Sequence, residues 1–350
     1  MKKIGIVCLV AITAVCWLWP DQSFSESERR KLQQCPKFSI SNLLSGRYMS
    51  EFEKYVVDQF PFRNQLLAGN QAASMTKDEN GLYEAEGHLS RMEYPLDKKS
   101  VETLLEKFQQ IQTEYFAENQ VYLSVIPDKN YYLAEENGYL EMDYETLFEM
   151  ANAVEGMEFI SLEAELSLND FYSTDTHWKQ EKIVDIADKF AGEMGITLPK
   201  TYEVKTMEKP FRGGYAGQYG IKQLSDTMQY VTNEVIEGMR VYDWEHDQEI
   251  KVYDAEKMNG SDGYELFLGG SLSLVTIENP KGMAGRELVL FRDSFGSSLA
   301  PLLAQGYEKV TLVDIRYIPF ERVYDMIEIE NADVLFLYSA SVLNHAETFQ

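Results

Sequence analysis

Cysteine is scarce in this sequence of 350 residues, which contains only Cys8, Cys16 and Cys35. The first two lie in an apolar N-terminal segment, so the rest of the chain has one thiol and can form no internal disulfide. The fold must therefore be held by the packing of its core. We do not expect Cys35 to be a catalytic thiol, because no histidine lies near it in the sequence.

Positive charge is also scarce. The chain has 32 lysines and arginines against 57 acidic residues, which gives a net charge of −25 and a pI near 4.6. A surface of this sign repels nucleic acid and does not favour anionic lipid, so no nucleic-acid partner is expected. We interpret the acidity mainly as a source of solubility. Hydrophobic residues make up 45% of the chain, enough for one large domain or two smaller ones.

The N-terminus carries an uncharged run over residues 4–19, preceded by two lysines. A run of roughly 16 residues lies between the core of a signal peptide and a full membrane span. No convincing cleavage site follows it, which slightly favours an uncleaved anchor at 1–20 over a cleaved signal. The protein is therefore expected to be extracytoplasmic, anchored in the membrane by this segment or secreted if it is cleaved. Residues 21–45 are polar and are interpreted as a linker or stalk.

Helix and strand patterns alternate over residues 46–350. Near-continuous apolar strands that alternate with amphipathic stretches are typical of a parallel sheet covered by helices. The predicted strands are 121–126, 158–162, 288–291, 309–313 and 333–338, and the predicted helices are 48–60, 101–117, 144–154, 179–194, 297–305 and 321–329. Residues 200–285 instead contain hairpin-like alternation at 239–253. We predict an α/β domain with a mainly parallel sheet and a β-rich insertion.

A predicted strand near the C-terminus ends in a charged turn that carries Ser294, and small residues open the following helix. An α/β fold presents a nucleophilic hydroxyl in this way, above the sheet and at the positive end of a helix. A serine hydroxyl is a weak nucleophile unless a base takes its proton, and histidine does so at neutral pH. The sequence must therefore supply a suitable histidine.

One of the four histidines is distinguished by its surroundings. His177 follows Asp175 by two positions, in a loop before a predicted helix, whereas the others lie in turns or near the C-terminus. In an extended chain, residues two apart face the same side, so Asp175 can reach the imidazole. Both this pair and Ser294 lie at the ends of α/β elements, where such folds place their sites. We therefore predict a triad of Ser294, His177 and Asp175.

Other chemistries fit the sequence less well. An α/β-hydrolase has the order Ser, acid, His and a Gly-x-Ser-x-Gly elbow, whereas here Arg292 replaces the first glycine and the Asp-His pair precedes the serine. There is no His-x-x-x-His motif, no tight cluster of histidines and carboxylates, and no phosphate-cradling loop. We expect no metal and no cofactor. The backbone N–H of Ser294 or Phe295 is the predicted oxyanion donor.

Four motifs occur in order along the chain: Phe-Glu-Lys-Tyr at 52–55, Asp-Gln-Phe-Pro-Phe-Arg at 58–63, Asp-Thr-His-Trp at 175–178 and Arg-Asp-Ser-Phe at 292–295. With them, residues 45–345 resemble the DHHW proteins of Gram-positive bacteria. Those are similar in turn to the SGNH-like proteins of alginate O-acetylation. Thr176 stands where the family name implies a second histidine, a position that the triad does not need.

The resemblance implies an SGNH-like three-layer α/β/α fold and catalytic roles for Ser294, His177 and Asp175. It also implies transfer of an acyl group, most often acetyl, to a hydroxyl of a cell-surface or secreted polysaccharide. A multi-pass membrane acyltransferase would supply the acyl group in such a system. Water in place of the sugar would make the protein an esterase.

Four further residues are predicted to contact substrate. Arg292 could bind an anionic glycan or acyl donor, or form an ion pair. Lys129 and Asn130 end a predicted strand, and Asn344 could be a second oxyanion donor. Two alternative functions stay open: a catalytically inactive glycan-binding or scaffold protein, and an esterase of lipids or peptides.

Overall fold

The computed structural model describes residues 20–25, 30–39, 47–60, 81–219, 224–329 and 331–349. The apolar run at 4–19 and the predicted break after residue 60 lie outside them. No helix within the described ranges is long and apolar enough to cross a membrane. The chain divides into two compact units, Met1–Lys77 with Gly214–Leu224, and Asp78–Gly213 with Ser225–Gln350. The domain limits drawn from the sequence stay a prediction.

In the part of the smaller unit that the structure describes, there are two short paired strands and two helices. They are β1 (Phe24–Ser25), β2 (Arg30–Lys31), α3 (Arg47–Asp58) and α9 (Gly214–Tyr219). Three aromatic rings follow one another along α3, Tyr48, Phe52 and Tyr55, with centroids 6.0 Å apart at each step. Residues three and four apart share a helix face, so the aromatic spacing explains the helix predicted there.

The larger unit is built on an eight-stranded sheet in the order β10-β9-β11-β13-β12-β14-β5-β6. Five neighbouring strands are parallel: β5 (Val121–Ile126), β6 (Glu158–Phe159), β12 (Met283–Arg292), β13 (Tyr307–Val313) and β14 (Ala332–Ser339). Three antiparallel strands extend one edge: β9 (Arg240–Asp243), β10 (Gln248–Ile250) and β11 (Leu274–Glu278). The predicted mainly parallel sheet is therefore confirmed.

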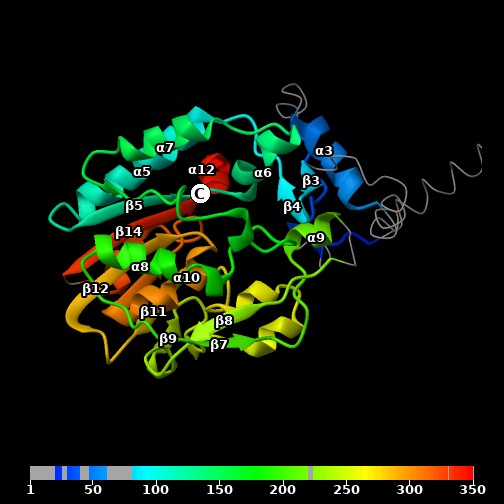
Figure 1. The fold of residues 1–350 in the computed structure, drawn as a ribbon. Coiled ribbons are helices and arrows are strands. Elements are labelled where there is room, and N and C mark those ends of the chain that lie inside the picture. Colours follow the sequence, from blue (N-terminus) through cyan, green and yellow to red (C-terminus); the bar gives the residue numbers. More distant parts are fainter. Residues whose placement is uncertain are drawn as a thin grey trace, which may run out of the picture. The chain divides into compact units, whose positions relative to one another are not determined.

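Helices cover both faces of this sheet and give three α/β/α layers (Figure 1). One face packs on α5 (Lys98–Tyr115), α7 (Tyr144–Asn152), α11 (Phe320–Met326) and α12 (Ala340–Leu343), and the other on α8 (Val184–Glu193) and α10 (Gly296–Leu303). Alternate residues of β12 pack into the two cores: Leu288 and Leu290 on the α8 side, and Val289 and Phe291 on the α5 side. Because both faces are buried, the strand is an uninterrupted apolar run in the sequence.

The predicted β-rich insertion is present, but its strands are shared between two sheets. Strands β7 (Glu203–Thr206) and β8 (Gln229–Thr232) form a separate antiparallel pair, whereas β9 to β11 extend the main sheet. Short 3-10 turns fill the connections: η1 (Leu168–Asp170), η2 (Gln180–Lys182), η3 (Ile236–Gly238), η4 (Ala255–Asn259), η5 (Gly263–Leu266), η6 (Ala304–Gly306) and η7 (Ala346–Thr348). The hairpin predicted at 239–253 is thus an edge of the sheet itself.

The sequence did not predict the hairpin of β3 (Leu82–Ala85) and β4 (His88–Arg91) or helix α6 (Lys129–Asn137). Helix α6 begins directly after β5, because the carboxylate of Asp128 accepts a hydrogen bond from the Asn130 N–H at 2.9 Å. Lys129 and Asn130 therefore begin a helix with their side chains buried, instead of ending the predicted strand.

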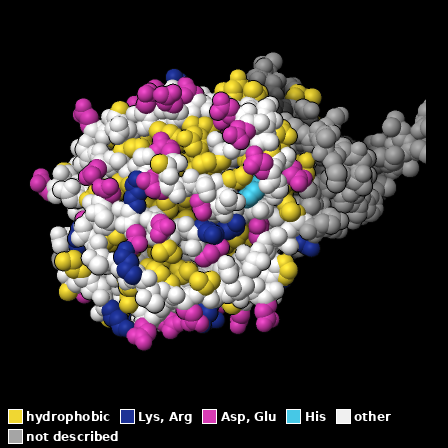
Figure 2. Space-filling view, viewed as in Figure 1, with side chains coloured by type: hydrophobic (Ala, Val, Ile, Leu, Met, Phe, Trp, Pro, Cys, Tyr) yellow, Lys and Arg dark blue, Asp and Glu magenta, His cyan; other side chains and the backbone are white. Residues whose placement is uncertain are grey.

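Acidic side chains are spread widely over the face of the molecule shown in Figure 2, and basic side chains lie among them in small groups. This distribution agrees with the net charge of −25.

Candidate active site

The turn that carries Ser294 lies just beyond the C-terminal end of β12, between its parallel neighbours β13 and β14. The buried carboxylate of Asp293 shapes this turn. It accepts hydrogen bonds from the Phe295 N–H at 3.0 Å and from the Ser339 N–H at 2.8 Å. Gly296 is required next, because a Cβ there would lie 2.6 Å from the Cβ of Arg292. The turn is therefore fixed to the ends of two strands.

The structure brings Ser294, His177 and Asp175 together. His177 Nε2 lies 2.7 Å from Ser294 Oγ, and His177 Nδ1 lies 2.5 Å from Asp175 Oδ1. The same carboxylate oxygen accepts the His177 backbone N–H at 3.1 Å, so Asp175 orients both the ring and its main chain. With the proton on Nδ1, Nε2 is left to accept the serine hydroxyl, as a general base must. Ser294 is partly exposed, whereas Asp175 and His177 are 4% and 9% exposed.

Aromatic packing holds the imidazole in this orientation. The Tyr264 ring stacks on His177 with centroids 3.8 Å apart, and Phe295 contacts it at 4.9 Å. Burial raises the pKa of Tyr264 well above its usual value, so its hydroxyl stays protonated and donates to Ser298 Oγ at 2.8 Å. Trp178 Nε1 donates to the same oxygen at 2.8 Å. No sequence pattern indicated a role for Tyr264, which lies in η5 within the insertion.

The loop before His177 is held by residues that the sequence did not single out. The Asp226 carboxylate accepts the Ser173 N–H at 2.9 Å, the Thr174 N–H at 2.8 Å and the Thr174 hydroxyl at 2.5 Å. The Gly213 N–H donates to Thr174 Oγ1 at 2.9 Å. A Cβ at Gly213 would lie 2.3 Å from the Cβ of Asp175, so only glycine fits.

Lys129 does not face solvent, contrary to its predicted role in substrate contact. Its side chain is inside the protein, with the residue 2% exposed, and Nζ donates to the Tyr172 carbonyl at 2.9 Å and the Ser173 carbonyl at 3.4 Å. Burial lowers the pKa of Lys129 to about 7, while the carboxylates of Asp175 and Asp226 act in the opposite direction. The prediction that Lys129 contacts substrate is therefore wrong, because its side chain contacts main-chain carbonyls inside the protein.

The other three predicted substrate contacts are also interior. Arg292 has no exposed surface and donates to a main-chain carbonyl at 3.0 Å. Asn130 is fully buried and accepts the Tyr83 hydroxyl at 2.8 Å. The Asn344 side-chain oxygen accepts the Asp97 N–H at 2.6 Å, and its amide donates to a carbonyl at 3.1 Å. All three side chains are buried, with at most 5% of the residue exposed, so none of the three is placed to meet a substrate.

The two predicted oxyanion donors differ in availability. The Phe295 N–H is taken by Asp293 at 3.0 Å. The Ser294 N–H has no acceptor within the described part of the chain. Ser294 precedes the first turn of α10, the end at which the helix dipole is positive. The Ser294 N–H is therefore the donor that can meet negative charge developing beside Ser294 Oγ.

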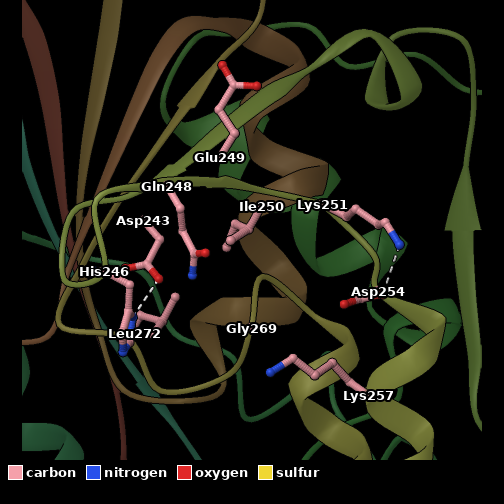
Figure 3. Close-up of a pocket in the computed structure, with 10 residues that line it drawn as sticks. All are labelled: Asp243, His246, Gln248, Glu249, Ile250, Lys251, Asp254, Lys257, Gly269 and Leu272. Carbon is pink, nitrogen blue, oxygen red and sulfur yellow. Dashed lines mark hydrogen bonds and ion pairs between the residues drawn. The ribbon is translucent and has the colours of Figure 1, made fainter.

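A pocket of about 620 Å³ lies elsewhere in the larger unit, between the β9–β10 hairpin and η4 (Figure 3). It is lined by Asp243, His246, Gln248, Glu249, Ile250, Lys251, Asp254, Lys257, Gly269 and Leu272, and by none of the triad residues. Two pairs of side chains are in contact there: His246 Nδ1 lies 2.7 Å from Asp243 Oδ2, and Lys251 forms an ion pair with Asp254 at 3.2 Å. Within the described ranges no group of three or more His, Cys, Asp and Glu side chains could hold a metal ion.

Comparison with family models gives no match, and the curated proteins give none either. Solved structures do match. A DHHW family protein from Eubacterium siraeum has a TM-score of 0.62 and 22% identity, over 77% of this chain and 95% of that chain. PatB1 of Bacillus cereus has a TM-score of 0.59 and 15% identity, over 75% of this chain and 96% of that chain. PatB1 is also known with a sulfonyl adduct.

These likenesses concern the fold. The protein has a three-layer α/β/α fold, and this fold is similar to that of a DHHW family protein, as the sequence motifs predicted. The O-acetyltransferase domain of Pseudomonas putida AlgJ has a TM-score of 0.42 and 12% identity, over 76% of this chain and 93% of that chain. That likeness is too distant to support a statement about activity.

Proposed function

We propose that this protein is an extracytoplasmic serine O-acyltransferase or esterase that acts on a polysaccharide, with acetyl as the acyl group. Ser294 is the nucleophile, His177 the general base and Asp175 the residue that orients the base. The observation that carries the proposal is the continuous path from Ser294 Oγ through the imidazole to the Asp175 carboxylate, with steps of 2.7 and 2.5 Å.

The reaction has two halves. His177 Nε2 takes the hydroxyl proton while Ser294 Oγ attacks the acyl carbonyl, and the Ser294 N–H stabilises the oxyanion. The imidazolium, held by Asp175, then gives its proton to the leaving group, and an acyl-serine remains. In the second half His177 deprotonates a sugar hydroxyl, which attacks the acyl-serine. The proton returns to Ser294 Oγ, and the product is an acylated sugar; with water in place of the sugar, the product is a free acid.

The location and partners are part of the same proposal. The apolar N-terminal run supports export of the body and a membrane anchor. A polysaccharide acceptor and a multi-pass membrane acyltransferase that supplies the acyl group follow from the resemblance to DHHW proteins. PatB1, which shares the fold, takes a sulfonyl adduct. Sulfonyl fluorides react with activated serines, so they suit a test on this chain.

The test is labelling by phenylmethylsulfonyl fluoride, followed by intact-mass and peptide analysis. We expect one adduct, on the peptide that contains Ser294, and none in Ser294→Ala. Ser261→Ala is the matched control, because Ser261 is an exposed serine outside the triad. Labelling of Ser294→Ala to the wild-type level would overturn the assignment. A wild-type protein that is neither labelled nor able to hydrolyse p-nitrophenyl acetate would favour the inactive glycan-binding alternative.

A further inference from the structure

A buried lysine contacts the loop that carries Asp175. Lys129 is the first residue of α6, immediately after the Asp128 cap at the end of β5. Its ammonium donates to the carbonyls of Tyr172 and Ser173, three and two residues before Asp175. The residue is only 2% exposed, so these main-chain oxygens, and not solvent, satisfy the charge.

A carboxylate holds the same loop through its N–H groups. Asp226 accepts the N–H groups of Ser173 and Thr174 and the Thr174 hydroxyl. The carbonyls of the loop thus meet a cation and its N–H groups meet an anion. This arrangement fixes the peptide planes directly before Asp175 from both directions.

The charges near Lys129 are mostly negative. The carboxyl groups of Asp175, Asp226 and Asp128 raise the pKa of Lys129 by their charge, the cation Lys179 lowers it, and Lys129 in turn lowers the pKa of His88. A carboxylate with little exposure, such as Asp175, is costly to keep ionised without a nearby positive charge. Lys129 is the buried cation among these groups that also contacts the Asp175 loop.

We propose that Lys129 is a positioning residue of the triad, which holds the Asp175 loop and supplies positive potential that favours the ionised carboxylate. Ionised Asp175 keeps the His177 proton on Nδ1, which leaves Nε2 free to accept the Ser294 hydroxyl. The catalytic meaning of this role rests on the proposed function, but the effect on His177 does not require turnover.

The experiment is histidine-selective NMR titration of the wild type, Lys129→Met and Lys129→Gln, with His177→Ala for assignment. Because the pKa of Lys129 is lowered to about 7, this side chain is charged below that pH. Removing the cation favours protonation of nearby groups there, so we expect the His177 titration midpoint to rise by about half a pH unit or more. The His88 midpoint should rise too, whereas exposed His246 should not move and serves as an internal reference. Lys189→Met is the matched control, because Lys189 pairs with Glu165 at the surface.

Kinetics separate positioning from substrate contact. For ester hydrolysis we expect Lys129→Met to lower kcat at nearly constant KM and to move the acid limb of kcat/KM to higher pH. A folded variant with an unshifted His177 titration, or with raised KM and unchanged kcat, would overturn the proposal. Lys129→Gln keeps an amide donor without the charge, and it replaces the methionine variant if that fails to fold.

The two proposals fail in different ways. A shifted His177 titration in a protein that hydrolyses no ester would support the positioning role and contradict the enzymatic one. Ester hydrolysis that depends on Ser294, together with an unshifted titration, would contradict the positioning role alone.

Discussion

The triad and the pocket beside the β9–β10 hairpin belong to the same compact unit, but the polar groups of the triad are largely buried whereas those of the pocket are largely exposed. Asp175 and His177 are almost fully buried, and their contacts are short. In the pocket, the side chains of His246 and Lys251 are 56% and 65% exposed. Exposed ion pairs are screened by water and contribute only about 0.2–1 kcal/mol, whereas burial strengthens each interaction.

The open pocket and the residues arranged for catalysis therefore lie in different parts of this unit. The pocket has a volume of about 620 Å³, but its His246 and Lys251 side chains are each in contact with a carboxylate. The triad offers one partly exposed hydroxyl whose base, orienting acid and loop are each held by several hydrogen bonds. Catalysis by a serine depends on this fixed geometry more than on the size of a cavity.

The largest expected effect is at the nucleophile. Ser294→Ala should lower kcat/KM for p-nitrophenyl acetate by about 10⁵-fold, because removal of a triad nucleophile leaves only binding and oxyanion contacts. Steady-state kinetics at matched protein concentration measure the loss. An activity of Ser294→Ala within tenfold of the wild type would place the chemistry elsewhere, with the pocket as the next region to examine.

A smaller loss is expected when the triad is displaced without removing any of its groups. Gly213→Ala places a Cβ 2.3 Å from that of Asp175, so the loop must shift, and we expect a loss of about 100-fold in kcat. The matched control is Gly192→Ala in α8, where a Cβ meets nothing within 4 Å. Equal kinetics for the two variants would show that the Asp175 loop tolerates displacement.

The burial of Asp128 should also change how the free energy of unfolding depends on pH. Burial raises the pKa of Asp128 to about 7, so the folded state holds a proton that the unfolded state releases at lower pH. The stability from this group is present below about pH 4 and is lost as pH rises to about 7. Asp128→Asn should remove that slope and raise Tm at pH 8 by a few degrees.

Thermal unfolding from pH 4 to 8 tests this, with Asp188→Asn as the control because Asp188 forms a surface pair with Lys200. A slope for Asp128→Asn identical to that of the wild type would contradict the assignment to Asp128.

The smallest effect is expected in the pocket. Lys257 pairs with Glu265 at 3.1 Å, and both side chains are about two-fifths exposed, at 44% and 40%. Lys257→Met should therefore change kcat/KM for the ester by less than about twofold. A loss above tenfold with unchanged stability would show that the pocket takes part in the reaction, and the contrast between the two regions would fail.

The sequence predicted the parallel strands because their two buried faces leave long apolar runs, as in β12 and β14. It predicted that Asp175 contacts His177, because the two are two residues apart. It also predicted that both lie close to Ser294, because strand ends share one edge of the sheet. It did not predict Asp226 or Tyr264. Their contacts with the Asp175 loop and with His177 join residues dozens of positions apart and leave no local pattern.

The substrate contacts were misplaced for a related reason. The end of a parallel strand is where a substrate contact is expected, but Asp128 starts a helix there, and Lys129 and Asn130 are buried. Arg292 and Asn344 likewise satisfy main-chain groups of neighbouring segments. Burial of a polar side chain depends on which segments pack around it, and residue type alone does not determine this.

The central claim is that Ser294 becomes covalently acylated through His177, and a rapid acid quench tests it most directly. The wild type is mixed with p-nitrophenyl acetate, stopped within the first turnover, digested and analysed by peptide mass spectrometry. The account predicts one acetyl group on the peptide that contains Ser294, and far less in His177→Ala. Acetylation of other residues with Ser294 unmodified, while the ester is being hydrolysed, would contradict it.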